Sequence, residues 1–95
     1  MADASPTSLA GYEFDRATAV RPGPEPGVAT VELDPTFAVG PKVHGGYLLA
    51  VLGRAAVDAA TSAGASHPHV VAATATYLGS PDPGPATVEA EVLRI

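Results

Sequence analysis

Cysteine and tryptophan are absent from this chain of 95 residues, and its aromatic residues are limited to three tyrosines and two phenylalanines. Without cysteine, disulfide bonds and zinc sites built on thiolates are excluded, and we expect a cytoplasmic location. With so few aromatic side chains, the hydrophobic core has to be built from valine, leucine and alanine, which bury little area each.

Basic residues are also scarce, with five lysines and arginines against ten acidic residues and a net charge of −5. Because the five are scattered, we expect no nucleic-acid surface. No apolar run reaches about 20 residues and no basic-then-apolar stretch opens the chain, so we expect neither a membrane span nor a signal peptide. Hydrophobic residues still make up 46% of the chain, which is typical of a globular domain.

The first third of the chain predicts a flexible leader followed by a β-hairpin. Residues 1–10 are small and polar without periodicity, so residues 11–95 are predicted to form the domain. Tyr12–Val20 and Val28–Leu33 alternate between apolar and polar residues, which predicts two strands. The proline- and glycine-rich run Arg21–Gly27 between them predicts a loop, and so an antiparallel pair.

A long apolar helix is predicted after a turn-rich loop. Asp34–Val43 contains turn formers, and Tyr47–Ala60 consists almost entirely of helix formers. Its charged residues, Arg54 and Asp58, are four apart and predict a solvated ion pair on a narrow polar stripe. The apolar surface around most of the helix indicates a place inside the domain.

The remainder of the chain predicts a return to β-structure. Gly53 weakens the helix or lets a strand or ligand approach it, and Gly64 predicts its end. Val70–Leu78 predicts a central strand against the helix, the Ser80–Pro85 run a turn, and Thr87–Ile95 a final strand. The order is β-β-α-β-β. The chain stops inside this last strand, so either another chain covers the open edge or, as we favour, the sequence is a fragment of a longer product.

His44-Gly45-Gly46 lies where the loop enters this helix. A helix N-terminus offers unpaired N–H groups and a partial positive charge, and glycines let a ligand approach the backbone. This arrangement suits a carbonyl oxygen that gains negative charge during acyl transfer, with the N–H of Gly46 or Tyr47 as donor and His44 orienting the carbonyl or a water. The simpler alternative is a tight loop that carries a surface histidine.

The run Phe37–Ala56 around this motif resembles the loop-and-helix segment of hotdog-fold acyl-CoA thioesterases. The segments 67–78, 83–86 and 88–94 resemble the strands that follow in the same family, closest to the N-terminal hotdog domain of bacterial double-hotdog thioesterases. The resemblance covers most of residues 12–94.

The resemblance implies an α+β hotdog fold, in which a curved antiparallel sheet of five or six strands wraps around one long central helix. Only four strands are predicted here, so the sheet is expected to be incomplete at the C-terminus. It also implies hydrolysis of an acyl-CoA to free fatty acid and CoA, without a cofactor. The domain would pair with a second hotdog, in cis or as a homodimer, with acyl-CoA at the interface.

Site residues follow from the same resemblance. The expected catalytic residues are His44, Gly46 and Tyr47, and Val43, Gly45 and Tyr77 are expected to bind substrate. In single-domain relatives a catalytic acid stands nine residues after the motif histidine, a position that Gly53 occupies here, followed by Arg54. In double-hotdog relatives the acid comes from the C-terminal hotdog.

Three alternatives remain open. The domain could be a non-catalytic hotdog that forms the pocket and dimer interface for a catalytic partner. An enoyl-CoA hydratase would need an Asp and a His placed together in the loop-helix region, and no such pair is found. His44, His67 and His69 could supply three imidazoles to a metal, but no carboxylate is placed to support them, so no metal site is expected.

Overall fold

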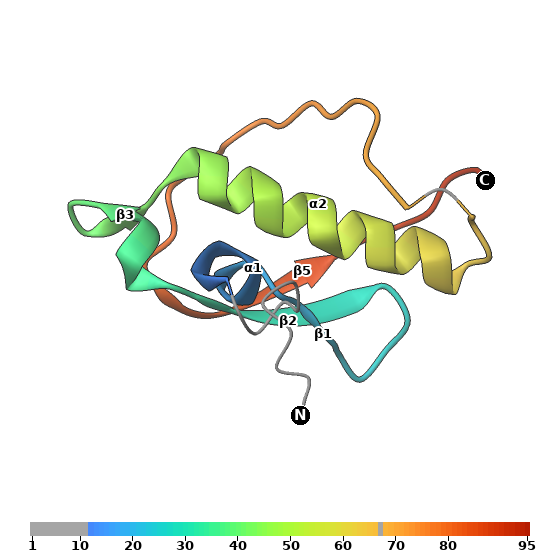
Figure 1. The fold of residues 1–95 in the computed structure, drawn as a ribbon, viewed down its shortest axis with the longest axis horizontal. Coiled ribbons are helices and arrows are strands. Elements are labelled where there is room, and N and C mark those ends of the chain that lie inside the picture. Colours follow the sequence, from blue (N-terminus) through green and yellow to red (C-terminus); the bar gives the residue numbers. More distant parts are fainter. Residues whose placement is uncertain (1–11, 67) are drawn as a thin grey trace.

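The computed structural model of the chain describes residues 12–66 and 68–95. The predicted leader, residues 1–10, lies outside the described residues, as does His67. Figure 1 shows one long helix lying across a small sheet, with a shorter helix at the side of the sheet. The elements in chain order are α1 (Glu13–Ala17), β1 (Arg21–Pro22), β2 (Val28–Leu33), the 3-10 turn η2 (Pro35–Phe37), β3 (Ala38–Val39), β4 (Lys42–Val43), α2 (Gly45–Ser62) and β5 (Gly84–Glu89).

The main sheet of the described residues is antiparallel, in the order β1-β2-β5. The predicted strand Val28–Leu33 is confirmed with the same bounds, and it pairs along its full length with Gly84–Glu89. On its other side it pairs with Arg21–Pro22. An edge position suits Pro22, because an edge strand leaves one row of backbone groups unpaired.

Helix α2 is longer than predicted by two residues at each end, and its ends explain why. The His44 side chain accepts a hydrogen bond at the start, which brings both glycines into the first turn. At the other end Gly64 has a φ of +104°, and the Ala65 N–H donates to the Ala60 carbonyl at 2.9 Å. This glycine-centred stop is the one that the sequence predicts.

The core lies between one face of α2 and the sheet. Tyr47, Val51 and Ala55 follow each other at intervals of four residues and are all buried. Tyr47 and Val51 pack with the inward side chains of β2 and neighbouring elements, namely Ala17, Val31, Leu33 and Val43. The opposite face of the helix is more open, since Leu49 and Leu52 stay about 40% exposed. Within the described residues, the predicted burial of the helix is therefore found on one face only.

The predicted strand Tyr12–Val20 is wrong. Its centre forms α1, a single short helix with a buried Ala17. A five-residue helix has little stability alone, so tertiary contacts decide its conformation. Those contacts come from α2, where the side chains of Tyr47 and Arg54 bind the backbone of α1 near its C-terminal end. Local alternation could not reveal partners that lie 30 or more residues away in the sequence.

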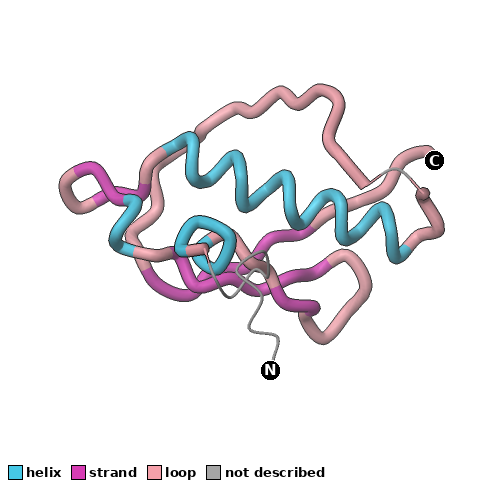
Figure 2. The backbone as a smooth tube through the Cα atoms, in the orientation of Figure 1, coloured by secondary structure: helices cyan, strands magenta, loops and turns pink. Residues whose placement is uncertain are grey.

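The predicted central strand Val70–Leu78 is also wrong, because these residues form no strand. They belong to a loop that runs along the side of α2 opposite the sheet (Figure 2). A strand needs a sheet edge to receive its hydrogen bonds. This loop instead meets the helix, where the Tyr77 hydroxyl donates to the Gly45 carbonyl at 2.8 Å.

The last strand is displaced toward the N-terminus. It was predicted over Thr87–Ile95 but covers Gly84–Glu89, so it starts inside the predicted turn. Its partner β2 is six residues long, and the chain turns at Gly27, directly before β2, where φ is +81°. Only the Ala90 N–H still reaches the Gly27 carbonyl, so the residues after it have no strand to pair with among the described residues.

Candidate functional site

The N-terminal turn of α2 is organised by His44. The His44 Nδ1 accepts a hydrogen bond from the Gly46 N–H at 3.0 Å, while the backbone N–H of His44 donates to the Phe37 carbonyl at 2.8 Å. The accepting Nδ1 places the proton of the neutral ring on Nε2. The ring is exposed, so His44 caps the helix and also presents an Nε2–H donor outward.

Tyr77 lies at the same turn. Besides its hydrogen bond to the Gly45 carbonyl, its ring is close enough to Gly45 that a Cβ there would meet it at 3.6 Å. The loop that carries it is held at the same end of the helix by the Val43 N–H, which donates to the Pro81 carbonyl at 3.0 Å. An exposed ion pair of 2.8 Å joins Lys42 and Asp82 beside it.

Tyr47 and Val43 have buried side chains. The Tyr47 hydroxyl donates to the Ala17 carbonyl and accepts from the Asp34 N–H at 3.1 Å, so this side chain ties α1 and the end of β2 to α2. Only the backbone of Tyr47 remains for chemistry at the helix entrance. The structure thus brings His44, Gly45, Gly46 and Tyr77 together at one surface, and it places the side chains of Val43 and Tyr47 in the core beneath.

Asp34 lies at the junction between β2 and this region. Its carboxylate accepts from the Thr36 N–H at 2.8 Å and caps the turn η2. Hydrogen bonds from the Thr36 backbone and side chain lower the pKa of Asp34, because they stabilise the ionised form. The negative charge helps to fix the turn that leads to Phe37 and His44.

Two hollows meet at Gly46. The larger is a groove of about 990 Å³ between the outer face of α2 and the loop that follows the helix. We call this groove the outer groove. From α2 it is lined by Gly46, Leu49, Leu52, Gly53, Ala56, Val57 and Asp58, among others, and from the loop by residues that include Val70, Ala73, Ala75 and Tyr77. Its lining is mostly apolar, which suits an aliphatic ligand.

The smaller hollow, of about 440 Å³, lies on the other side of the motif. His44 and Gly46 line it together with Phe14 and Phe37. The Phe37 ring stacks on Tyr47 with centroids 5.0 Å apart, and Phe14 approaches Phe37 edge-on at 5.4 Å. We call this the aromatic hollow. No pattern in the sequence indicates this hollow, because the alternation around Phe14 predicts a strand.

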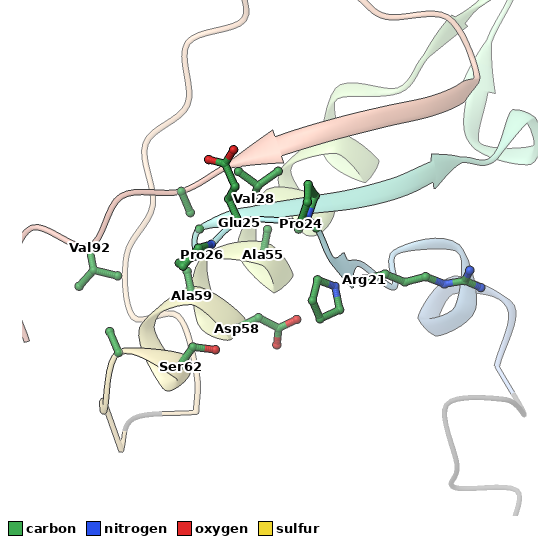
Figure 3. A pocket seen from close by; sticks show the side chains of 16 residues that line it. Arg21, Pro24, Glu25, Pro26, Val28, Ala55, Asp58, Ala59, Ser62 and Val92 are labelled. Atoms are coloured by element: carbon green, nitrogen blue, oxygen red, sulfur yellow. The ribbon is translucent and has the colours of Figure 1, made fainter.

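A third hollow, of about 500 Å³, lies at the far half of α2 (Figure 3). The proline-rich loop between β1 and β2 covers it, and Asp58 and Ser62 of α2 line it. Figure 3 shows the Arg21 side chain pointing away from Asp58. None of the expected site residues lines this hollow, so we assign it no part in the candidate site.

Arg54 has a different role from the one predicted. The expected solvated pair with Asp58 is wrong, because the guanidinium donates to the Asp15 carbonyl and to Thr18 Oγ1, each at 3.0 Å. Arg54 is thereby directed at the C-terminal end of α1, where carbonyl groups lack helical partners and a cation is favoured. Spacing within α2 could not reveal this contact, since it joins residues 36 or more positions apart in the sequence.

No helix among the described residues is both long and apolar enough to cross a bilayer. They also contain no group of three or more His, Asp or Glu side chains placed to hold a metal ion. The three-histidine alternative includes His67, which lies outside the described residues.

Comparison with known proteins identifies the class. The sequence profile of the family described as "Acyl-CoA thioesterase N-terminal domain" matches residues 33–95. The crystal structure of a candidate thioesterase II from Thermobifida fusca YX is similar to the chain, with a TM-score of 0.75 and 36% sequence identity. No curated protein sequence matches significantly. The chain therefore belongs to the acyl-CoA thioesterase N-terminal domain family.

The match confirms the resemblance and the predicted fold class, an α+β hotdog with an antiparallel sheet around a single long helix. It covers 86% of this chain but 29% of the Thermobifida protein, so the chain spans less than a third of that protein's length. The limits 11–95 of the domain, the site residues and the cytoplasmic location stay predictions.

Proposed function

We propose that this domain binds an acyl-CoA thioester at the N-terminal turn of α2 and contributes to its hydrolysis to free fatty acid and CoA. The observation that carries the proposal is the hydrogen bond from the Gly46 N–H to His44 Nδ1. It shows that this N–H points out of the helix toward an acceptor. A thioester carbonyl oxygen would take the place of the imidazole nitrogen, close to the positive end of the helix dipole.

In this proposal the donors are the backbone N–H groups of Gly46 and Tyr47. The displaced His44 ring would then orient the carbonyl or the attacking water. Gly45 and Gly46 leave the approach open, since neither places a side chain over the helix end. Tyr77 borders the site from the loop side and would contact the substrate.

Both hollows begin at Gly46, so the acyl chain and the pantetheine arm of the thioester would each enter a different one. We place the acyl chain in the outer groove, because its lining is apolar and it follows the helix axis through Leu49, Gly53 and Ala56. The aromatic hollow would then receive the start of the pantetheine arm beside His44.

Activation of water is assigned to a second hotdog. Gly53 carries no acid, and Asp58 lies twelve residues from Gly46, roughly 18 Å along the helix axis. A carboxylate from a hotdog paired in cis or in a homodimer would complete the site. The proposed protein is thus a pair of hotdogs in which this domain supplies the carbonyl-binding turn.

The alternative is that this hotdog is non-catalytic and forms the pocket and interface for a catalytic partner. It is favoured by the same hydrogen bond, because an N-cap is by itself a sufficient structural role for His44. The two functions differ in what His44 must offer: a cap needs only an acceptor, whereas catalysis also needs the imidazole ring.

His44→Asn separates them. Asparagine is among the best N-caps, so the variant should keep its thermal stability. If His44 takes part in hydrolysis, kcat/KM for acyl-CoA should fall about a hundredfold, the loss typical of a removed hydrogen-bonding group at an acyl-transfer site. Released thiol would be measured over a panel of saturated acyl-CoAs with the full-length protein, with His44→Ala losing both cap and ring.

The outcomes are distinct. A folded His44→Asn protein with unchanged kcat/KM would establish the non-catalytic alternative. A wild-type protein that hydrolyses no acyl-CoA of any chain length would refute the thioesterase proposal itself.

A further inference from the structure

Arg54 makes contacts that the proposed reaction does not use. It leaves α2 toward α1, where its guanidinium donates to the Asp15 carbonyl and to Thr18 Oγ1. Thr18 is 1% exposed although it is polar. Its N–H and its hydroxyl both donate to the Phe14 carbonyl at 3.0 Å. Arg54 therefore fixes the last turn of α1 and, through Thr18, the backbone of Phe14.

The Phe14 side chain in turn lines the aromatic hollow. Its ring meets Phe37 edge-on at 5.4 Å and Tyr47 at 6.3 Å. These geometries are favourable for aromatic pairs. Yet Phe14 is 45% exposed, so few other contacts restrain its ring. Without the anchor at α1, the ring would lose its fixed place against Phe37.

Phe37 connects the aromatic side chains to the proposed site. Its ring stacks on Tyr47, and its carbonyl accepts the His44 N–H at 2.8 Å. The position of Phe37 thus sets the backbone from which the His44 ring reaches Gly46. Each link from Arg54 to His44 is a hydrogen bond or a ring contact.

From this chain of contacts we infer that Arg54 is a positioning residue for His44, acting through α1 and the Phe14–Phe37 pair. The inference rests on the proposed function for its effect on rate. Loss of Arg54 would let α1 and Phe14 move, and the His44–Gly46 geometry would follow. Displacements of about 1 Å at a reacting centre cost rates of up to about a hundredfold. Arg54 also lines the outer groove, but a substitution that keeps its apolar stem keeps this wall, so substrate affinity would change little.

The test is a double-mutant cycle of Arg54→Met and Phe14→Leu in the full-length protein. Methionine keeps the apolar stem of Arg54 and removes its donors. Each single variant is expected to lower kcat for dodecanoyl-CoA about tenfold. KM should stay within twofold in Arg54→Met, whereas it should rise in Phe14→Leu, because Phe14 also lines the aromatic hollow in which the pantetheine arm is placed. The double variant should be no worse than either, because both act through the same contacts. Arg54→Lys should recover part of the rate, since an ammonium can donate to the same acceptors.

Arg21→Met is the matched control, because it removes a guanidinium that lies outside the candidate site, and it should leave kcat unchanged. The ¹⁵N–¹H signal of Gly46 gives a readout independent of turnover and should shift in Arg54→Met but not in Arg21→Met. Should Arg54→Met fail to fold, Arg54→Lys and Phe14→Leu complete the same cycle with smaller expected effects.

Unchanged kcat in folded Arg54→Met, or losses that multiply in the double variant, would overturn the positioning role. If the wild type hydrolyses no acyl-CoA, the proposed function fails, and the Gly46 signal alone decides: a shift in Arg54→Met supports the positioning role and an unmoved signal overturns it.

Discussion

The two faces of α2 differ in what covers them. The inner face, with Tyr47, Val51 and Ala55, is almost fully buried against the sheet. The outer face, with Leu49 and Leu52, borders an open groove whose far wall is a loop without regular structure. That loop meets the helix by a few defined contacts at its N-terminal end.

Side chains of α2 that stabilise the fold and those that line the proposed site therefore lie on different faces of the helix. Side chains of the inner face are fixed by close packing, and changes there are felt throughout the domain. Side chains of the outer face are free to meet a ligand or a second domain. The helix entrance with His44, Gly45 and Gly46 lies where the two regions meet, so the proposed site has a rigid base and an open approach.

The largest expected effect concerns the outer face. Gly53 follows Gly46 by seven residues, which places it roughly 10 Å along the helix. An extended chain advances roughly 1.25 Å per C–C bond, so about eight carbons span this distance. A leucine at this position would block longer chains, and each excluded methylene costs about 0.8 kcal/mol, or roughly fourfold. About four carbons of dodecanoyl-CoA lie beyond this point, so Gly53→Leu should lower its kcat/KM roughly 200-fold and leave hexanoyl-CoA unchanged.

Thr61→Leu is the control, because Thr61 is exposed on the same helix and lines none of the three hollows. A Cβ at Gly53 would lie 3.7 Å from Val70, an ordinary contact, so the variant should fold. If kcat/KM depended on acyl-chain length equally in the two variants, the acyl chain would not lie in the outer groove.

Substitutions at two neighbouring residues compare how much each face contributes to the free energy of unfolding. Val51 is 2% exposed and Leu52 is 42% exposed. Val51→Ala should lower the free energy of unfolding by about 2 kcal/mol, since it opens a cavity in the core. Leu52→Ala should change it by less than about 0.5 kcal/mol, as for surface substitutions. Urea denaturation measures both, and equal losses would show that the outer face is covered as firmly as the inner one.

Tyr77 tests how the outer loop is attached. Tyr77→Phe removes the hydrogen bond to the Gly45 carbonyl, which is exposed, so the global stability should fall by only about 0.5 kcal/mol. Locally the effect should be larger, with faster amide exchange over residues 70–80 than in the wild type. Exchange that rises equally in β2 would mean that the loop is part of the same cooperative unit as the sheet.

Asp34 gives the smallest effect, dependent on pH. Its lowered pKa means that the ionised carboxylate is favoured in the folded state, so its contribution to stability is complete above the ordinary value of 3.8. That contribution is lost as the pH falls through the lower pKa of the folded state. Asp34→Asn does not titrate, so its stability relative to the wild type should be constant above about pH 5 and shift below pH 4. A constant difference down to pH 2 would contradict the hydrogen-bonded carboxylate.

What could be predicted from the sequence follows the same division. The strand Val28–Leu33 and the body of α2 were predicted correctly, because their apolar periodicity reflects the buried face on which they pack. The loop over Val70–Leu78 has the composition of a strand but no sheet edge to pair with, which no local pattern can show. The helical state of α1 depends on Tyr47 and Arg54, which lie far along the chain.

The candidate site divides in the same way. The His44-Gly45-Gly46 entrance was located correctly at the start of the helix, since glycines and a change of period mark it in the sequence. That His44 caps Gly46, and that Tyr77 reaches Gly45, depends on side-chain directions and on the path of the outer loop. The sequence could therefore suggest these residues without showing which of them touch.

We propose that a thioester binds at Gly46 with its acyl chain on the outer face of α2. Amide chemical shifts would test it directly during titration with a non-hydrolysable dodecanoyl-CoA analogue, in which a methylene separates the sulfur from the carbonyl. The largest shifts should occur at Gly46, Tyr47 and Gly53, with little change at Val31 in the sheet. Shifts confined to the proline-rich loop Arg21–Gly27, or none at saturating analogue, would contradict the claim.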